Sequence, residues 1–218
     1  MGTTFPVTAI FARPDVERLQ PYSAPLEGRR GLLRLDFNEN TVGPSPKVVK
    51  AIRSIPADLY AIYPEYNGLR EAVAASLHAT ACPTPVQSFS GPSLDALPQP
   101  GAPRPRLGAP NIGLFNGVDA AIHAIFHAFG APGDRLLTTS PTFGYYLPCA
   151  RLQGMAIEAI PYRLPDFSFP LEAIRRAGAD ARLLLICNPN NPTGTRLAPE
   201  RILELAAGAP GTLAVSYT

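Results

Sequence analysis

Leu183-Leu184-Leu185-Ile186-Cys187-Asn188-Pro189-Asn190-Asn191-Pro192-Thr193-Gly194 is the most informative stretch of this sequence. Its first five residues are apolar, and a run of this length is typical of a strand that is buried on both faces of a parallel sheet. The seven that follow are Asn, Pro, Thr and Gly, of which Asn, Pro and Gly are common in turns. Because open α/β sheets bind ligands at the carboxyl ends of their central strands, this turn is a candidate ligand-binding loop.

Outside this stretch, short apolar segments alternate with amphipathic segments along the chain. Strands are expected at 112–115, 135–139, 155–160, 183–187 and 212–215. The alternation predicts an α/β fold with a mostly parallel sheet flanked by helices.

Three of the expected helices have apolar residues on one face. The first begins after Ser45, with Pro46 at its first position, and its apolar face carries Val48, Ile52 and Ile55. The second spans about 69–78, and its buried stripe is expected to be Leu69, Val73 and Leu77. The third follows Asn116-Gly117, and its inward-facing residues are expected to be Val118, Ile122, Ile125, Phe126 and Phe129.

The composition argues against several classes of function. The net charge is only +2 and the basic residues are scattered, so no nucleic-acid partner is expected. The three cysteines form no C-x-x-C pair, which indicates a reducing, cytoplasmic compartment. We expect no secretory signal, because the N-terminus lacks a basic region followed by an apolar stretch. We expect no membrane span, because no apolar stretch is long enough for a bilayer.

Asp119, His123 and His127 recur at four-residue spacing on one helix face. Two histidines at that spacing can bind a metal. No third ligand is identifiable and His123 lies among apolar residues, so packed or surface histidines are the preferred interpretation and no metal is expected.

The ordered string Asn188–Gly194 after a buried strand resembles the cofactor loop of the fold-type I, pyridoxal-phosphate-dependent aminotransferases. Other segments resemble the histidinol-phosphate branch of that family. They are L-D-F-N-E-N at 35–40, Y-P-E-Y-N-G-L-R at 63–70, the N-G-V-D turn at 116–119 and S-P-T-F at 140–143. The likeness covers about residues 35–82 and 111–215, in the family's chain order.

The resemblance implies a phosphate site and a ring site for pyridoxal 5'-phosphate. Gly117, Val118 and Asp119 would lie under the phosphate, at a helix N-terminus that offers free N–H groups. Tyr63 would reach the phosphate of a neighbouring subunit in a homodimer. Tyr63 could instead be an aromatic anchor that packs a loop.

Two further residues would contact the cofactor ring in this family. Phe143 would stack on the pyridine ring, and Asn191 would hydrogen-bond to the ring oxygen. Phe143 could instead fill the core as a buried aromatic residue.

The resemblance also shows which chemical groups these 218 residues lack. The family bonds its cofactor to a lysine and pairs the ring nitrogen with a carboxylate. The sequence has only two lysines, Lys47 and Lys50, on a helix where a solvated face is the simple interpretation. The strand expected to begin at 212–215, and the residues that continue it to 218, contain no Asp. We therefore expect a C-terminally truncated chain that is inactive alone and has no catalytic residue of its own.

The expected organisation has four parts. They are an N-terminal arm at 1–34, the beginning of the small and large domains at 35–82, a proline-rich disordered insertion at 83–110, and a partial cofactor-binding large domain at 111–218. Eight of the 28 residues of the insertion are proline, a composition that discourages a packed core.

By resemblance, the function would be transfer of an amino group between an amino acid or amine phosphate and 2-oxoglutarate. A related activity, such as threonine-phosphate decarboxylation, and a non-catalytic fragment remain alternatives. The sequence does not identify the substrate.

Overall fold

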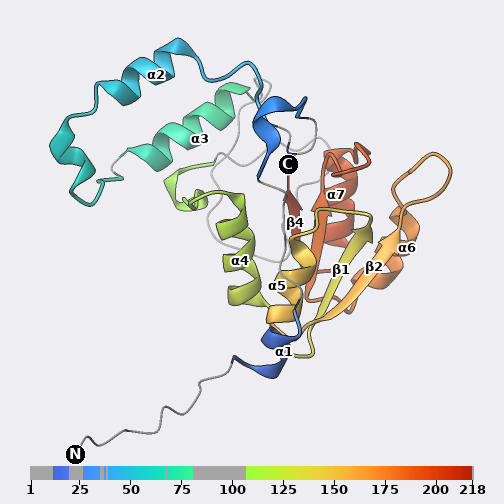
Figure 1. Ribbon diagram of the computed structural model, residues 1–218. Helices are drawn as coiled ribbons and strands as arrows, with labels where there is room; N and C mark the ends of the chain where they lie inside the picture. The colour runs from blue at the N-terminus through green and yellow to red at the C-terminus, as the bar shows by residue number, and fades with distance from the viewer. Residues whose placement is uncertain are drawn as a thin grey trace, which may run out of the picture. The chain divides into compact units, whose positions relative to one another are not determined.

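The structure, a computed structural model, describes residues 12–19, 27–34, 37, 39–66, 68–80 and 107–217 (Figure 1). They divide into two compact units. The first unit holds the described residues of 12–19 and 114–217, and the second holds those of 27–80 and 107–113. Residues 35, 36 and 38 of the segment at 35–40, and residues 83–106 of the predicted insertion, lie outside the described residues.

The first unit is built on a sheet of four parallel strands. They are β1 (Arg135–Ser140), β2 (Ala156–Pro161), β3 (Leu183–Cys187) and β4 (Leu213–Tyr217). Their order is β2-β1-β3-β4, and each adjacent pair is parallel. The strand that precedes the Asn-Pro turn, β3, therefore lies inside the sheet and is buried along its whole length. The predicted α/β fold with a mostly parallel sheet is confirmed.

Helices cover both faces of this sheet. Helices α4 (Val118–Phe129) and α5 (Tyr146–Leu152) pack on one face, and α6 (Leu171–Gly178) and α7 (Pro199–Ala207) pack on the other. A short helix, α1 (Pro14–Glu17), contacts α5. No helix in the described parts of the chain is both long enough and apolar enough to cross a bilayer.

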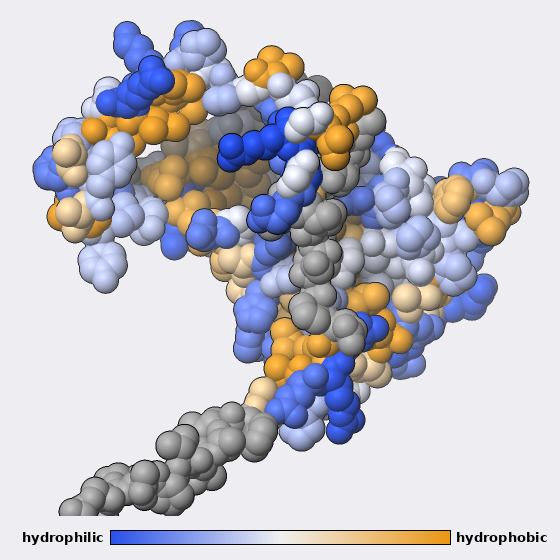
Figure 2. Space-filling model, in the orientation of Figure 1, coloured by the Kyte–Doolittle hydropathy of each residue, from blue (hydrophilic) through white to orange (hydrophobic). Residues whose placement is uncertain are grey.

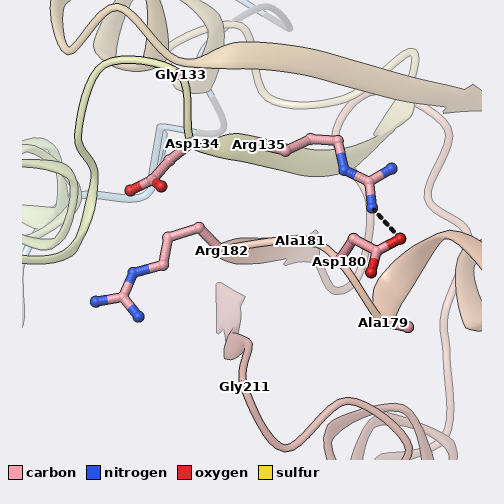
Figure 3. A pocket seen from close by; sticks show the side chains of 8 residues that line it. All are labelled: Gly133, Asp134, Arg135, Ala179, Asp180, Ala181, Arg182 and Gly211. Atoms are coloured by element: carbon pink, nitrogen blue, oxygen red, sulfur yellow. Dashed lines mark ion pairs between the residues drawn. The ribbon is translucent and has the colours of Figure 1, made fainter.

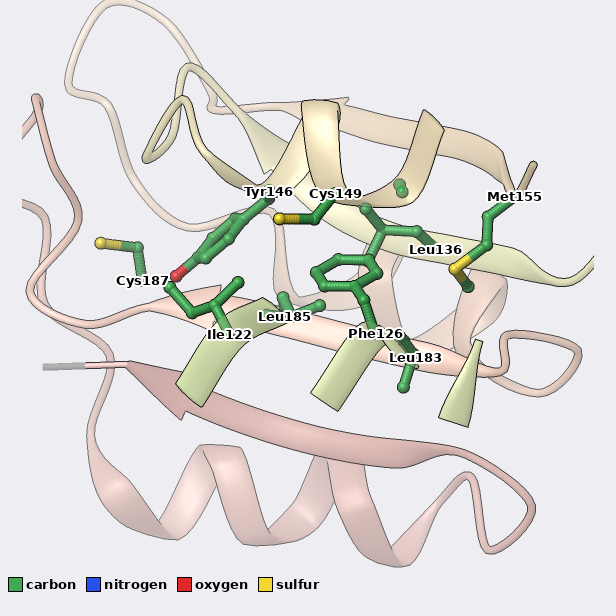
Figure 4. Close-up of a cluster of buried hydrophobic side chains, with 10 residues drawn as sticks. Ile122, Phe126, Leu136, Tyr146, Cys149, Met155, Leu183, Leu185 and Cys187 are labelled. Atoms are coloured by element: carbon green, nitrogen blue, oxygen red, sulfur yellow. The ribbon is translucent and has the colours of Figure 1, made fainter. Parts of the chain in front are cut away.

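The core follows the alternation of side chains along the strands. The cluster beneath α4 and α5 is drawn in Figure 4, and it contains Ile122, Phe126, Leu136, Tyr146, Cys149, Ala150, Met155, Leu183, Leu185 and Cys187. The cluster beneath α6 and α7 contains Leu137, Ile174, Ala181, Leu184, Ile186, Leu197 and Leu205. Successive β3 residues alternate between the two clusters, so this strand stabilises both layers.

The second unit contains short helices. Its elements are η1 (Arg29–Gly31), α2 (Pro46–Arg53), η2 (Ala57–Tyr60), α3 (Leu69–Thr80) and η3 (Ala109–Asn111). Ser45 accepts the Lys47 N–H at the start of α2, as expected for an N-cap. Among the described residues of this unit, only Ala74 is buried. Figure 2 shows hydrophobic side chains at the surface over α2.

The burial predicted for α3 is wrong. Leu69 and Leu77 are exposed and Val73 is half-buried, whereas Ala74 is buried. Apolar spacing identifies a face of a helix, but burial needs a second surface, and the described residues cover only the position of Ala74.

The burial predicted for α4 is correct only in its middle. Ile122 and Phe126 are buried and Ile125 is half-buried, while Val118 and Phe129 are exposed. Val118 and Phe129 are the first and last residues of the helix, so they lie beyond the part that packs on the sheet.

The strand predicted at 112–115 is absent. These residues follow η3 and form no ladder. A short apolar run becomes a strand only where a neighbouring strand completes its hydrogen bonds, and Gly113 weakens this one further.

Candidate functional site

The candidate residues of the first unit lie near the carboxyl edge of the sheet. Phe143 comes three residues after the end of β1, and Asn191 comes four residues after the end of β3. Because β1 and β3 are parallel neighbours, both loops leave from the same edge. Helix α4 precedes β1 and is joined to its amino end by a short loop, so the helix N-terminus at Gly117 points toward that edge as well.

Asn190 joins the two loops. Its side chain is almost fully buried, with 2% exposed. The Nδ2 amide donates to the Pro141 carbonyl at 3.0 Å, and Oδ1 accepts the Thr142 hydroxyl at 3.1 Å. Buried amide groups need such partners, so the burial of Asn190 depends on the two loops staying together.

Hydrogen bonds also hold the loop after β3 to itself. Asn188 donates to the Leu197 carbonyl at 2.9 Å and accepts the Leu197 N–H at 2.8 Å. The Asn191 N–H donates to the Cys187 sulfur at 3.3 Å. The side chain of Asn191 is exposed and forms no hydrogen bond with any described residue. The loop is therefore braced internally while one amide remains open for a ligand.

Phe143 is half-buried and packs against the core cluster beneath α4 and α5. Its ring centroid lies 5.6 Å from that of Tyr146, edge to face, and 6.5 Å from that of Tyr145. These contacts are typical of aromatic pairs. They hold the ring from the core side and leave part of it accessible.

The N-terminus of α4 has an open geometry. Gly117 has φ +83° and ψ 165°, no side chain caps the helix, and a Cβ placed on Gly117 would meet no atom within 4 Å. The first N–H groups of a helix, here including those of Val118 and Asp119, have no partner within the helix. Together with the helix dipole, they can bind an anion.

Two titratable groups lie near this helix end. Burial is the main cause that raises the pKa of the Cys149 thiol. The hydrogen bond with Tyr145 lowers this pKa, and the negative charge of Asp119 raises it further. The pKa of Tyr145 is raised by burial, then by Cys149 and finally by Asp119. A neutral buried thiol is inert, so Cys149 is a packing residue rather than a nucleophile.

The two histidines of α4 contact each other. The rings of His123 and His127 are edge to face, with centroids 4.5 Å apart. Within the described parts of the chain, no group of three or more His, Cys, Asp or Glu side chains could hold a metal ion.

Tyr63 belongs to the second unit, unlike the other five candidates. Its side chain is 97% exposed. Lys47 and Lys50 are also in this unit, exposed on α2. Five candidate residues therefore share the sheet unit, and Tyr63 does not.

A hollow of about 330 Å³ lies at the opposite edge of the sheet (Figure 3). It is lined by Gly133, Asp134, Arg135, Ala179, Asp180, Ala181, Arg182 and Gly211. These residues precede or begin β1, β3 and β4. Arg135 already pairs with Glu158 and donates to the Ala177 carbonyl. The hollow is thus separate from the candidate residues, which lie where parallel sheets bind ligands.

Comparison with known proteins identifies the family of the chain. Residues 30–215 match the family model described as aminotransferase class I and II. The chain belongs to the class I and II aminotransferase family. This result confirms the predicted family, and it covers both units.

Individual members of the aminotransferase family give the same result. The chain is 35% identical to the histidinol-phosphate aminotransferase of Roseiflexus castenholzii over 88% of this chain and 50% of that protein. It is 32% identical to that of Symbiobacterium thermophilum, over 93% and 51%. The chain thus spans about half the length of the curated relatives it matches.

A solved aminotransferase structure supports the fold. The histidinol-phosphate aminotransferase from Sinorhizobium meliloti, solved in complex with pyridoxal-5'-phosphate, superposes with a TM-score of 0.67 at 23% identity. The match covers 98% of this chain and 51% of that one.

Asn188, Asn190 and Thr142, which brace the loops, are not among the residues predicted from the sequence. The aminotransferase motif points to Asn191 alone in this loop. A signal was available, because several polar side chains directly after a buried strand must find partners among themselves or in neighbouring loops.

Proposed function

We propose that this chain forms the phosphate and ring side of a pyridoxal-phosphate site in an aminotransferase of histidinol-phosphate type. The observation that carries the proposal is the joined pair of loops after β1 and β3. They hold the accessible part of Phe143 and the open amide of Asn191 at one edge of the sheet.

The residues of the first unit fit the three parts of the cofactor. The uncapped N-terminus of α4 suits the phosphate, because Gly117 leaves room and the N–H groups are free of helix partners. Phe143 suits a flat ring, and the Asn191 amide suits a ring oxygen. The Asp119 carboxylate adds negative charge at this helix end, so Asp119 would contribute through its backbone N–H.

When bound, pyridoxal phosphate supplies the electron sink for amino-group transfer. The residues of this chain would bind and orient it. The helix end would hold the phosphate, Phe143 would cover one face of the ring, and Asn191 would set the rotation of the ring in its plane. The substrates of the whole protein would be an amino acid or amine phosphate and 2-oxoglutarate.

The test is a titration of the purified chain with pyridoxal phosphate, followed by absorbance and fluorescence. We expect saturable binding that inorganic phosphate displaces, and weaker binding in Asn191→Ala. Absence of saturable binding, or binding that phosphate does not displace, would contradict the proposal.

A second proposal concerns the chain by itself. Both of its lysines are exposed on α2, and an exposed lysine lacks the apolar surroundings that lower its pKa for covalent chemistry. The 218-residue chain would then bind the cofactor without bonding to it and without transferring amino groups. Reduction with borohydride followed by peptide mass mapping tests this, and a labelled Lys47 or Lys50 would refute it.

We also propose that the whole protein is a cytoplasmic homodimer. Tyr63 is nearly fully exposed, as expected if its partner lies on a second subunit. The measurement is the oligomeric state, by sedimentation, of a protein extended to the length of its relatives. A stable monomer that binds the cofactor with full affinity would contradict the proposal.

A further inference from the structure

Three of the strand exits at the carboxyl edge are connected by one chain of hydrogen bonds. It begins at the loop after β1, where Pro141 and Thr142 contact the Asn190 side chain. The other Nδ2 hydrogen of Asn190 is directed to the Thr193 hydroxyl at 2.8 Å. The Nδ2 group of Asn190 thus donates both to the loop after β1, at Pro141, and within its own loop, at Thr193.

The chain continues to the loop after β2. The Thr193 hydroxyl donates to that of Thr195 at 2.9 Å, which donates to the Phe167 carbonyl at 2.8 Å. Phe167 has φ +52°, a left-handed conformation that non-glycine residues rarely adopt. Strands β2, β1 and β3 are neighbours in the sheet, so the hydrogen bonds link adjacent exits.

The backbone of Asn190 reinforces its position. Its N–H donates to the Thr195 carbonyl at 2.8 Å, and its carbonyl accepts the Gly194 N–H at 2.7 Å. With the side chain held as well, Asn190 has little freedom to move independently of the loop. The adjacent residue, Asn191, consequently takes its direction from this anchored position.

We propose that Asn190 is a positioning residue, which sets the distance between the ring-facing side chains of Phe143 and Asn191 by clamping the loop after β1 to the loop after β3. The proposal rests on the proposed cofactor site, but the clamp itself is a property of the described contacts. Asn190 would not touch the cofactor, because its side chain is buried and its amide groups are occupied.

The clamp separates two parts of the binding site. The N-terminus of α4 takes no part in the hydrogen-bond chain, so loss of the clamp should weaken ring binding and leave phosphate binding intact. Inorganic phosphate tests the helix end alone, and pyridoxal phosphate tests both parts. The ratio of the two dissociation constants therefore reports the clamp.

Thr142 supplies a matched pair of variants. Thr142→Val keeps the shape and removes the hydroxyl that Asn190 accepts, whereas Thr142→Ser keeps the hydroxyl. Thr212→Val is the control for stability, because Thr212 bonds to the Gly178 and Ala181 carbonyls at the other edge of the sheet. Asn190→Ala removes the clamp altogether.

We expect Thr142→Val to weaken the binding of pyridoxal phosphate about tenfold, the effect of one lost buried hydrogen bond. Asn190→Ala removes three side-chain hydrogen bonds and should weaken binding at least as much. Phosphate affinity should change by less than about twofold, and Thr142→Ser and Thr212→Val should keep the wild-type ratio. An equal loss for both ligands, or the same ratio change in Thr212→Val, would overturn the proposal.

If the wild-type chain binds no cofactor, that result refutes the proposed function but not the clamp. Amide hydrogen exchange then tests the clamp without any ligand. With the clamp broken, exchange should quicken in both 141–146 and 188–195 in Thr142→Val, but not in Thr142→Ser. Unchanged exchange in either loop would refute the clamp.

Discussion

The two units of this chain use apolar side chains in opposite ways. In the sheet unit, two clusters of large apolar residues are enclosed between the sheet and its helices. In the second unit, Val48, Ile52, Leu59 and Leu69 are exposed, and Ala74 is its one buried residue among those described. Similar residue types thus stabilise the first unit and leave the second with little core.

The difference shows what a second layer contributes. Helices α4 to α7 bury their stripes because the sheet offers two continuous apolar faces. Helices α2 and α3 also carry apolar side chains, and the described residues offer them no such face. The stability of the described chain should therefore reside in the sheet unit, and mutations can test this directly.

The largest expected effect comes from a pair of leucines. Leu185 on β3 is 0% exposed and Leu59 on η2 is 49% exposed. Leu185→Ala should lower the free energy of unfolding by about 2–5 kcal/mol, because it leaves a cavity. Leu59→Ala should cost less than about 1 kcal/mol. Urea unfolding followed by circular dichroism measures both, and equal costs would remove the contrast between the units.

A pair of asparagines tests the same contrast with hydrogen bonds. Asn188 bonds to the N–H and carbonyl of buried Leu197, and exposed Asn40 bonds in a similar way to Val42 and Gly43. Asn188→Ala should cost about 1–3 kcal/mol, because buried groups lose their partners. Water replaces the lost partners at Asn40, so Asn40→Ala should cost at most about 0.5 kcal/mol. If Asn40→Ala cost as much as Asn188→Ala, the turn at Asn40 would be protected from water.

The N-termini of α4 and α2 are both exposed to solvent, at Gly117 and Ser45, but they differ in their capping. Gly117→Ala should destabilise the chain by about 1–3 kcal/mol, since φ +83° with ψ 165° suits glycine almost alone. Ser45→Ala, which removes the cap of α2, should cost about 1 kcal/mol. Thermal unfolding compares them, and a neutral Gly117→Ala would mean that the helix start relaxes.

The smallest effect is a loss of stability in alkali. Burial raises the pKa of Cys149, Tyr145 and Tyr162 above ordinary values of 9.0, 10.0 and 10.0. These groups lose their protons at a lower pH in the unfolded chain than in the folded chain. The stability that they contribute is therefore complete below the ordinary pKa values, and it is lost as the pH rises through the raised pKa values of the folded chain. Urea midpoints should fall between about pH 8 and about pH 10.5. Tyr162→Phe should reduce the slope, and a flat profile would contradict the prediction.

Much of the sheet unit could be predicted from the sequence because its signals are local. The five apolar residues of β3, the Asn-Pro turn after them and the proline at the start of α7 each specify an element over a few residues. Parallel pairing then follows from the alternation of strands and helices. The strand expected at 112–115 did not form, because a strand also depends on a neighbour that its own residues do not encode.

The sequence alone determined the alternation of helices and strands in the sheet unit and the family to which the chain belongs. Only the tertiary structure decided which Asn of the motif is buried and which is open. Asn190 meets Thr142 and Pro141 across separations of 48 and 49 residues, and no local pattern reports such contacts. For the same reason Ala74 is buried on α3, whereas Leu69 and Leu77 are exposed. Spacing along a helix or a turn fixes the direction of a side chain, but burial depends on what the rest of the chain brings against it.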